Sequence, residues 1–76
     1  MVRTLMDVTT AQYDVLEAAI ANARRLAVWR RGTEYLVIPH ALRLVAGREA
    51  LDTRHPNTGD SLRLWIDEID RFELVR

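Results

Sequence analysis

The stretch Leu26-Ala27-Val28-Trp29-Arg30-Arg31-Gly32-Thr33-Glu34-Tyr35-Leu36-Val37-Ile38 decides the fold of this chain. Two runs in it, 26–31 and 34–38, are rich in β-branched, aromatic and other apolar residues, and they flank Gly32, which suits a tight turn. The pattern predicts an antiparallel β-hairpin.

Beyond this hairpin the β-pattern continues with interruptions. Pro39 has no amide hydrogen to give to a ladder, so we expect it to end the second strand or to lie at its edge. A second hairpin is predicted from 42–46 and 49–53 around Gly47. Residues 54–60 concentrate Pro, Asn and Gly and predict a loop.

After the loop, apolar and polar residues alternate from Leu62 to Asp67, the pattern of a half-buried strand. A turn through Glu68 to Asp70 then leads into a last extended piece near 72–75. Apart from these elements the chain shows no internal repeat or low-complexity segment.

A helix is predicted ahead of the sheet, over residues 9–24. Thr9 followed three residues later by Gln12 fits a capping box, and Val8 and Tyr13 are spaced to form a hydrophobic staple over the first turn. Apolar residues then recur at helical spacing on one face: Tyr13, Leu16, Ile20 and Ala23.

The 76 residues have room for one domain, which we divide into a lead (1–8), a helix (9–24) and a β-part (25–76). The expected class is α+β, with a strongly bent five-stranded antiparallel sheet curled into an Sm-like small barrel, because twist and unpaired edges disfavour a flat sheet of this size. The absence of cysteine, of a signal-peptide pattern and of a long apolar run predicts a soluble cytoplasmic protein that does not enter the membrane.

All eleven cationic side chains are arginine, which can make forked contacts with phosphate or carboxylate. GC-rich codon usage would give the same bias. The segment 24–54 holds seven arginines against three acidic residues, whereas each flanking segment has a net charge of −2. The middle of the chain is therefore its cationic part.

From about Leu26 to Leu74 the chain resembles a WYL domain, an Sm-like module of bacterial transcription regulators and phage-defence accessory proteins. The resemblance is carried by Val37-Ile38-Pro39-His40-Ala41-Leu42, by Gly47-Arg48, and by Leu64-Trp65-Ile66-Asp67-Glu68-Ile69. It implies a small barrel and a regulatory role in binding a nucleic acid or a nucleotide-type ligand.

The chain departs from the family at positions that bear on ligand binding. Glu49-Ala50-Leu51 stands where the family has its Trp-Tyr-Leu, so only the leucine is kept. Trp65 and Glu68 replace two arginines that resemble ligand-contacting groups in the family. The resemblance therefore supports the fold more strongly than the ligand.

Catalysis is not expected. The chain has one serine, two histidines and no cysteine, with neither a glycine-rich phosphate loop nor paired histidines that could hold a metal. Asp67, Glu68 and Asp70 lack the spacing of a calcium loop and are better interpreted as a solvated acidic edge. We expect a binding module without a cofactor or metal.

The expected ligand is single-stranded nucleic acid or a nucleotide-type anion, held by cations and by stacking on aromatic rings. Alternation places Arg25, Trp29 and Arg31 on one face of the first strand, and Arg63 with Trp65 on one face of a later strand. The candidate binding residues are Arg25, Trp29, Arg31, Arg43, Arg48, Arg63 and Trp65.

A second interpretation stays open. Both tryptophans could lie in the core or in an interface, with the arginines solvated, since Trp and Arg are also enriched at interface hot spots. The chain would then be a small homo-oligomeric adaptor that binds a protein partner and no nucleic acid. Homo-oligomer formation is expected in either case, because small domains with exposed sheet edges gain stability from association.

Overall fold

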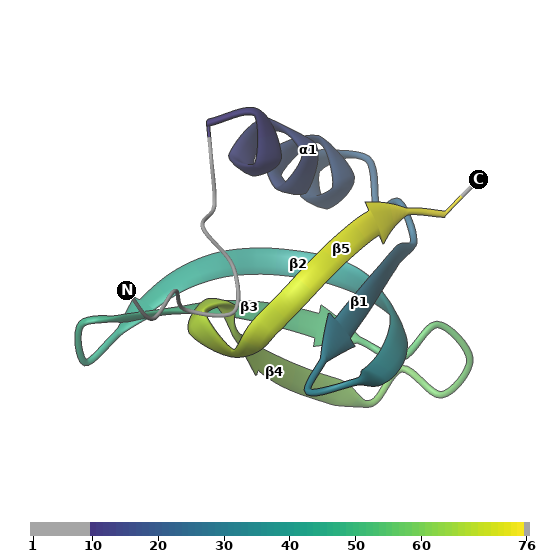
Figure 1. Cartoon of the computed structure of the whole chain (residues 1–76). Coiled ribbons are helices and arrows are strands. Elements are labelled where there is room, and N and C mark those ends of the chain that lie inside the picture. The colour runs from purple at the N-terminus through teal and green to yellow at the C-terminus, as the bar shows by residue number, and fades with distance from the viewer. Residues whose placement is uncertain (1–9, 76) are drawn as a thin grey trace.

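The computed structural model describes residues 10–75, which form a helix followed by five strands (Figure 1). The elements are α1 (Thr10–Ala21), β1 (Leu26–Arg30), β2 (Thr33–Val45), β3 (Arg48–Arg54), β4 (Ser61–Trp65), η1 (Ile66–Glu68, a 3-10 helix) and β5 (Ile69–Leu74). All strand pairs are antiparallel, in the order β4-β3-β2-β1-β5. The predicted α+β class is confirmed.

The sheet has two free edges. β4 pairs only with β3, β5 pairs only with β1, and no pairing joins β4 to β5 within residues 10–75. Figure 1 shows the sheet curving around a central space while α1 lies above it. The sheet is thus bent, as predicted, but it is not closed into a barrel.

Both predicted hairpins are confirmed, and both have the same turn. The central residues are Arg31 (φ 51°) and Gly32 (φ 79°) in the first hairpin, and Ala46 (φ 51°) and Gly47 (φ 82°) in the second. Two consecutive positive φ values in a two-residue loop are the signature of a type I′ turn, whose twist matches that of the strands. Glycine takes up the second position at no steric cost.

Of the two alternatives predicted for Pro39, the one in which it ends a strand is wrong, because β2 runs through it. The expected segments 34–38 and 42–46 are one long strand that changes partner: up to Val37 it pairs with β1, and from Ile38 onward with β3. A bulge at His40 shifts the register beside Pro39. A bulge next to a change of partner is where a residue without an amide hydrogen is tolerated.

Helix α1 ends at Ala21, three residues before the predicted end at 24. Ala23 has a left-handed backbone (φ 50°), and the amide of Arg24 donates to the carbonyl of Ala19 at 2.9 Å. A left-handed residue followed by this long-range bond is a Schellman-type C-cap. It turns the chain out of the helix and into β1.

The helix contributes a narrow apolar stripe to the core. Leu16 and Ala19 are fully buried, but Ala23 is exposed in the turn and does not belong to the apolar face, contrary to prediction. The predicted capping box and staple depend on Val8 and Thr9, which lie outside the described residues.

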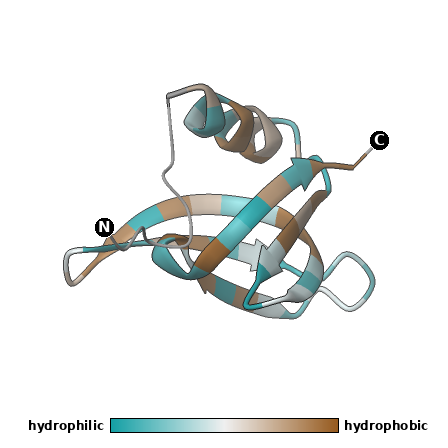
Figure 2. Ribbon diagram, viewed as in Figure 1, coloured by the Kyte–Doolittle hydropathy of each residue, from teal (hydrophilic) through white to brown (hydrophobic). Residues whose placement is uncertain are grey.

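The core fills the space between α1 and the inner side of the bent sheet. Apolar and polar residues alternate along the strands (Figure 2). The buried cluster consists of Leu16, Ala19, Leu26, Val28, Val37, Leu51, Leu64, Ile66 and Ile69. Thr53 is the buried polar residue of the described part, and its hydroxyl donates to the carbonyl of Leu62 at 2.8 Å.

The loop predicted at 54–60 is confirmed between β3 and β4, and it is tied together internally. The amide of His55 donates to the carbonyl of Asp60, and the amide of Gly59 donates to the carbonyl of His55, both at 2.9 Å.

Within residues 10–75 no helix has the length and apolarity needed to cross a bilayer.

Candidate anion-binding site

Three neighbouring strands, β2, β3 and β4, present arginines on the outer face of the sheet. Asp52 of β3 is paired with Ala41 on one side and Arg63 on the other. Cross-strand partners project to the same face, and so do residues two apart along a strand. This places six residues on one surface, which we call the arginine face: Arg43, Arg48, Asp52, Arg54, Arg63 and Trp65.

Asp52 lies at the centre of the arginine face and is shared by two arginines. Nε of Arg43 donates to Oδ2 at 2.7 Å, and Nε of Arg63 donates to Oδ1 at 2.7 Å. The hydrogen bond from Arg63, and then the one from Arg43, hold the pKa of Asp52 below its ordinary value of 3.8. One carboxylate therefore balances one of two guanidinium charges, and a net positive charge remains.

A groove of about 420 Å³ lies beside this ion-pair cluster at the beginning of β4. Its lining residues are His40, Asp52, Thr53, Arg54, Ser61, Leu62 and Arg63. Arg54 is exposed and makes no ion pair with any residue of the described part. Its guanidinium is available for a forked contact with a phosphate or carboxylate.

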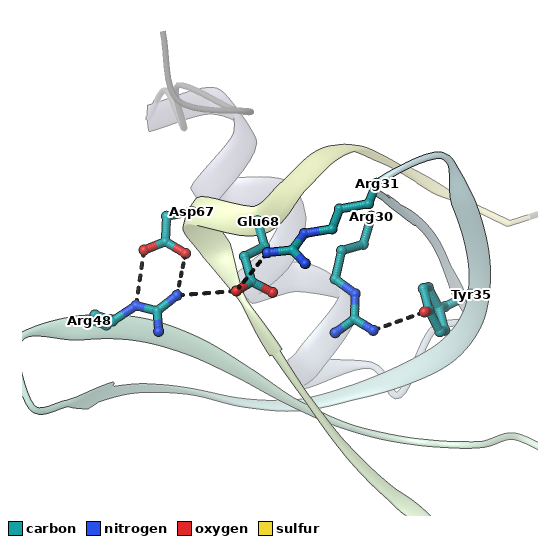
Figure 3. A network of polar contacts seen from close by, with 6 residues as sticks. All are labelled: Arg30, Arg31, Tyr35, Arg48, Asp67 and Glu68. Carbon is teal, nitrogen blue, oxygen red and sulfur yellow. Dashed lines mark hydrogen bonds and ion pairs between the residues drawn. The ribbon is translucent and has the colours of Figure 1, made fainter. Parts of the chain in front are cut away.

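Arg48 forms ion pairs with the acidic turn that precedes β5. Its guanidinium binds both carboxylate oxygens of Asp67, at 2.7 and 3.0 Å, and approaches Glu68 at 3.5 Å (Figure 3). Arg31 reaches the same Glu68 at 3.6 Å from the turn between β1 and β2. The hydrogen bond from Arg48 lowers the pKa of Asp67, so the carboxylate remains ionised. The predicted acidic edge is thus partly neutralised by arginines.

The ring of Trp65 lies directly under Arg48. The guanidinium carbon is 4.3 Å from the ring centroid, within the range of a cation–π contact. Trp65 is half-buried, and its strand partner Ala50 is fully buried. One side of the indole is therefore already occupied by an intramolecular cation.

The other tryptophan lies elsewhere, where β1 meets β5. Trp29 is paired with Arg71, whose guanidinium stacks on its ring at 3.9 Å. Arg25 precedes β1, is exposed and has no ion pair within the described part. Contrary to the prediction from alternation, Arg31 does not continue this face, because it occupies a left-handed turn position after β1.

The structure therefore divides the predicted site. It brings together Arg43, Arg48, Arg63 and Trp65 on the arginine face, and it places Arg25 and Trp29 elsewhere. Arg31 lies in the hairpin turn outside that face but contacts Glu68, which Arg48 also contacts.

Of the seven residues that line the groove, only Arg63 was among the predicted binding residues, and the six that were missed include Asp52, Arg54 and His40. Arg54 has the same strand parity as Arg48 and Asp52, so extending the alternation by one step would have identified it. His40 carries no such signal, because the bulge that contains it is visible only in the pairing of β2 with β3.

The chemistry that these residues offer is charge recognition. Within residues 10–75 no three His, Cys, Asp or Glu side chains converge to hold a metal ion.

No family model matches the chain, and no curated protein or solved structure is significantly similar to it.

Proposed function

We propose that this chain is a WYL-like regulatory module that binds a nucleic acid or a nucleotide-type anionic ligand and has no catalytic activity of its own. The observation that carries the proposal is the arrangement around Asp52. Two arginines share this carboxylate, and a third arginine, Arg54, lies in the same groove without an ion partner in the described part.

An anion at the groove would be held by geometry that exists before binding. Asp52 fixes the guanidinium of Arg63, so less side-chain entropy is lost when a phosphate binds. The overall charge of zero weakens any broad electrostatic attraction, so affinity depends mainly on these local contacts and falls as salt rises.

The fold supports the same assignment. A helix followed by five antiparallel strands in a bent sheet is the order of elements expected for an Sm-like module. The sheet edges β4 and β5 remain apart in residues 10–75, so the Sm-like likeness applies to the order and curvature of the elements. The proposed compartment is the cytoplasm, where a regulator of this kind would meet its ligand.

The experiment is a titration of a labelled single-stranded oligonucleotide at low salt, followed by anisotropy. Reversing Arg31 and Arg48 is a poor choice of variant, because both contact Glu68 and the change would disturb an internal network. Arg54→Glu is cleaner, since it breaks no ion pair of the described part.

The matched control is Arg24→Glu, which makes the same charge change beside α1 and β5, in a different cavity. We expect Arg54→Glu to lose at least about tenfold in affinity, corresponding to one charge-assisted contact, and Arg24→Glu to lose much less. Equal losses in the two variants, or a wild-type chain that does not bind, would contradict the proposal.

The alternative is a homo-oligomeric adaptor that binds protein and no nucleic acid. It is favoured by the unpaired edges of β4 and β5 and by the exposure of Leu36, Leu44 and Leu74. Strand edges with apolar side chains nearby invite association with another chain. Light scattering coupled to size exclusion tests it, and a monomer at tens of micromolar would remove its main support.

A further inference from the structure

We propose that the ligand of this chain is a mononucleotide, with its phosphate in the groove beside Arg54 and its base in a second cavity that adjoins the groove at the beginning of β4. This inference rests on the proposed function and specifies the ligand class of the same site.

The second cavity has a volume of about 370 Å³. It is lined by Glu34, Tyr35, Leu36, Val37, His55, Asp60, Ser61 and Leu62. Ser61 and Leu62 also line the groove, so the two cavities share this stretch of β4. Small-molecule pockets have volumes of roughly 300–1,000 Å³, and each cavity is large enough for one part of a nucleotide.

The two cavities differ in chemistry in the same way as the phosphate and the base of a nucleotide. The groove contains Arg54 and Arg63 against one carboxylate, which suits a phosphate. The second cavity is bordered by Leu36, Val37 and Tyr35, which suits a flat, largely apolar base. Arg30 lies over one face of the Tyr35 ring at 4.9 Å and donates to its hydroxyl, so that face of the ring is already occupied. Ser61, which lines both cavities, lies where the two parts would join.

Two carboxylates border the base cavity and set a preference among bases. Glu34 and Asp60 are exposed and make no ion pair with any residue of the described part. An ionised carboxylate only accepts hydrogen bonds. A base with adjacent N–H groups on its edge, such as guanine, satisfies this requirement, whereas the ring acceptor of adenine opposes it.

His55 adds a fixed donor. Its Nδ1 accepts hydrogen bonds from the amides of Asn57, at 3.1 Å, and Thr58, at 3.3 Å. The ring hydrogen of the neutral imidazole must therefore be on Nε2. Because the loop holds this ring through backbone bonds, Nε2–H is oriented before a ligand arrives and can donate to an oxygen of the base or ribose.

The test is isothermal titration of the full chain with GMP, AMP, guanosine and inorganic phosphate. We expect GMP to bind at least about tenfold more tightly than guanosine or phosphate, because each of these fills only one cavity. We expect the same margin over AMP, because the ring acceptor of adenine faces the carboxylates. Arg54→Gln should weaken GMP and phosphate but not guanosine. Glu34→Gln should weaken GMP and guanosine but not phosphate, and Arg24→Gln should change none of them.

Each contrary result has a defined meaning. If GMP binds no better than phosphate, the second cavity does not hold a base and the inference is overturned. If the oligonucleotide binds in the anisotropy titration while GMP does not, the mononucleotide is wrong and the proposed function stands. If neither binds, both fail. Thermal unfolding of each variant shows whether the folded state is retained.

Discussion

Asp52 orients Arg63, but its negative charge competes with any anion for Arg43 and Arg63. Removing that charge while keeping a side-chain oxygen that can accept from Arg63 should therefore strengthen ligand binding. Asp52→Asn keeps the size of the side chain and removes its charge. The two ion pairs are on the surface, where such pairs contribute little, so the folded state should persist with a small loss of stability.

The gain in affinity can be estimated from Coulomb's law. A unit charge about 6 Å away in water contributes about 0.7 kcal/mol for each unit of ligand charge. A phosphate monoester carries nearly two charges above neutral pH, so the gain is about 1.4 kcal/mol, or roughly tenfold in the dissociation constant. At a physiological ionic strength the Debye length is about 8 Å, so the gain should shrink.

The assay is titration of wild type and Asp52→Asn with GMP at low and at physiological salt. The matched control is Asp67→Asn, which also releases an arginine, Arg48, but outside the groove. We expect a smaller gain in the control. An affinity for Asp52→Asn that is unchanged or reduced, with the folded state intact, would refute the placement of the anion beside Asp52.

The same carboxylate also makes stability depend on pH. Because its pKa is lower in the folded state than its ordinary 3.8, its stabilising contribution is fully present above that value. The contribution is lost as the pH falls below 3.8 and through the folded value. Urea unfolding between pH 5 and about 2 should therefore show a shallower decline in Asp52→Asn than in wild type.

Three further predictions concern stability. The hydroxyl of Tyr13 donates to Glu49, which raises the pKa of that phenol to about 12, so absorbance should show a tyrosine titrating there that is missing in Tyr13→Phe. Its contribution to stability is present below pH 10 and is lost as the pH rises through 12. Thr53→Val removes a buried hydrogen bond to β4 and should cost about 1–2 kcal/mol in urea unfolding. Ala46→Asn should relieve a left-handed alanine and raise the melting temperature by about 4 °C, and a decrease would contradict the turn assignment.

Local features of the fold were predictable from the sequence because they depend on residues close together in the chain. Gly32 and Gly47 mark the two hairpins, since a two-residue loop needs positive φ values that glycine adopts without cost. Alternation along 62–67 correctly placed Arg63 and Trp65 on one face. The breakers at 54–60 correctly predicted the loop.

Errors arose where distant parts of the chain meet. Pro39 lies inside a long strand because β2 exchanges one partner for another at that point, and no local pattern records an exchange of partners. Ala23 has helical spacing but lies in the left-handed turn that directs the chain into β1. Trp29 alternates like Trp65, yet the pairing of β1 with β5 places it beside Arg71.

The sequence by itself determined the α+β fold class, the positions of the hairpins and the presence of many arginines, because periodicity, turn chemistry and composition are properties of the chain itself. Only the tertiary structure decided which arginines are available to a ligand. Arg48 and Arg54 look equivalent in the sequence, but η1 carries Asp67 to the first, while no described carboxylate forms an ion pair with the second. Charge neutralisation depends on distances of a few ångströms across strands, and those distances are set by register and by the bend that encloses the core.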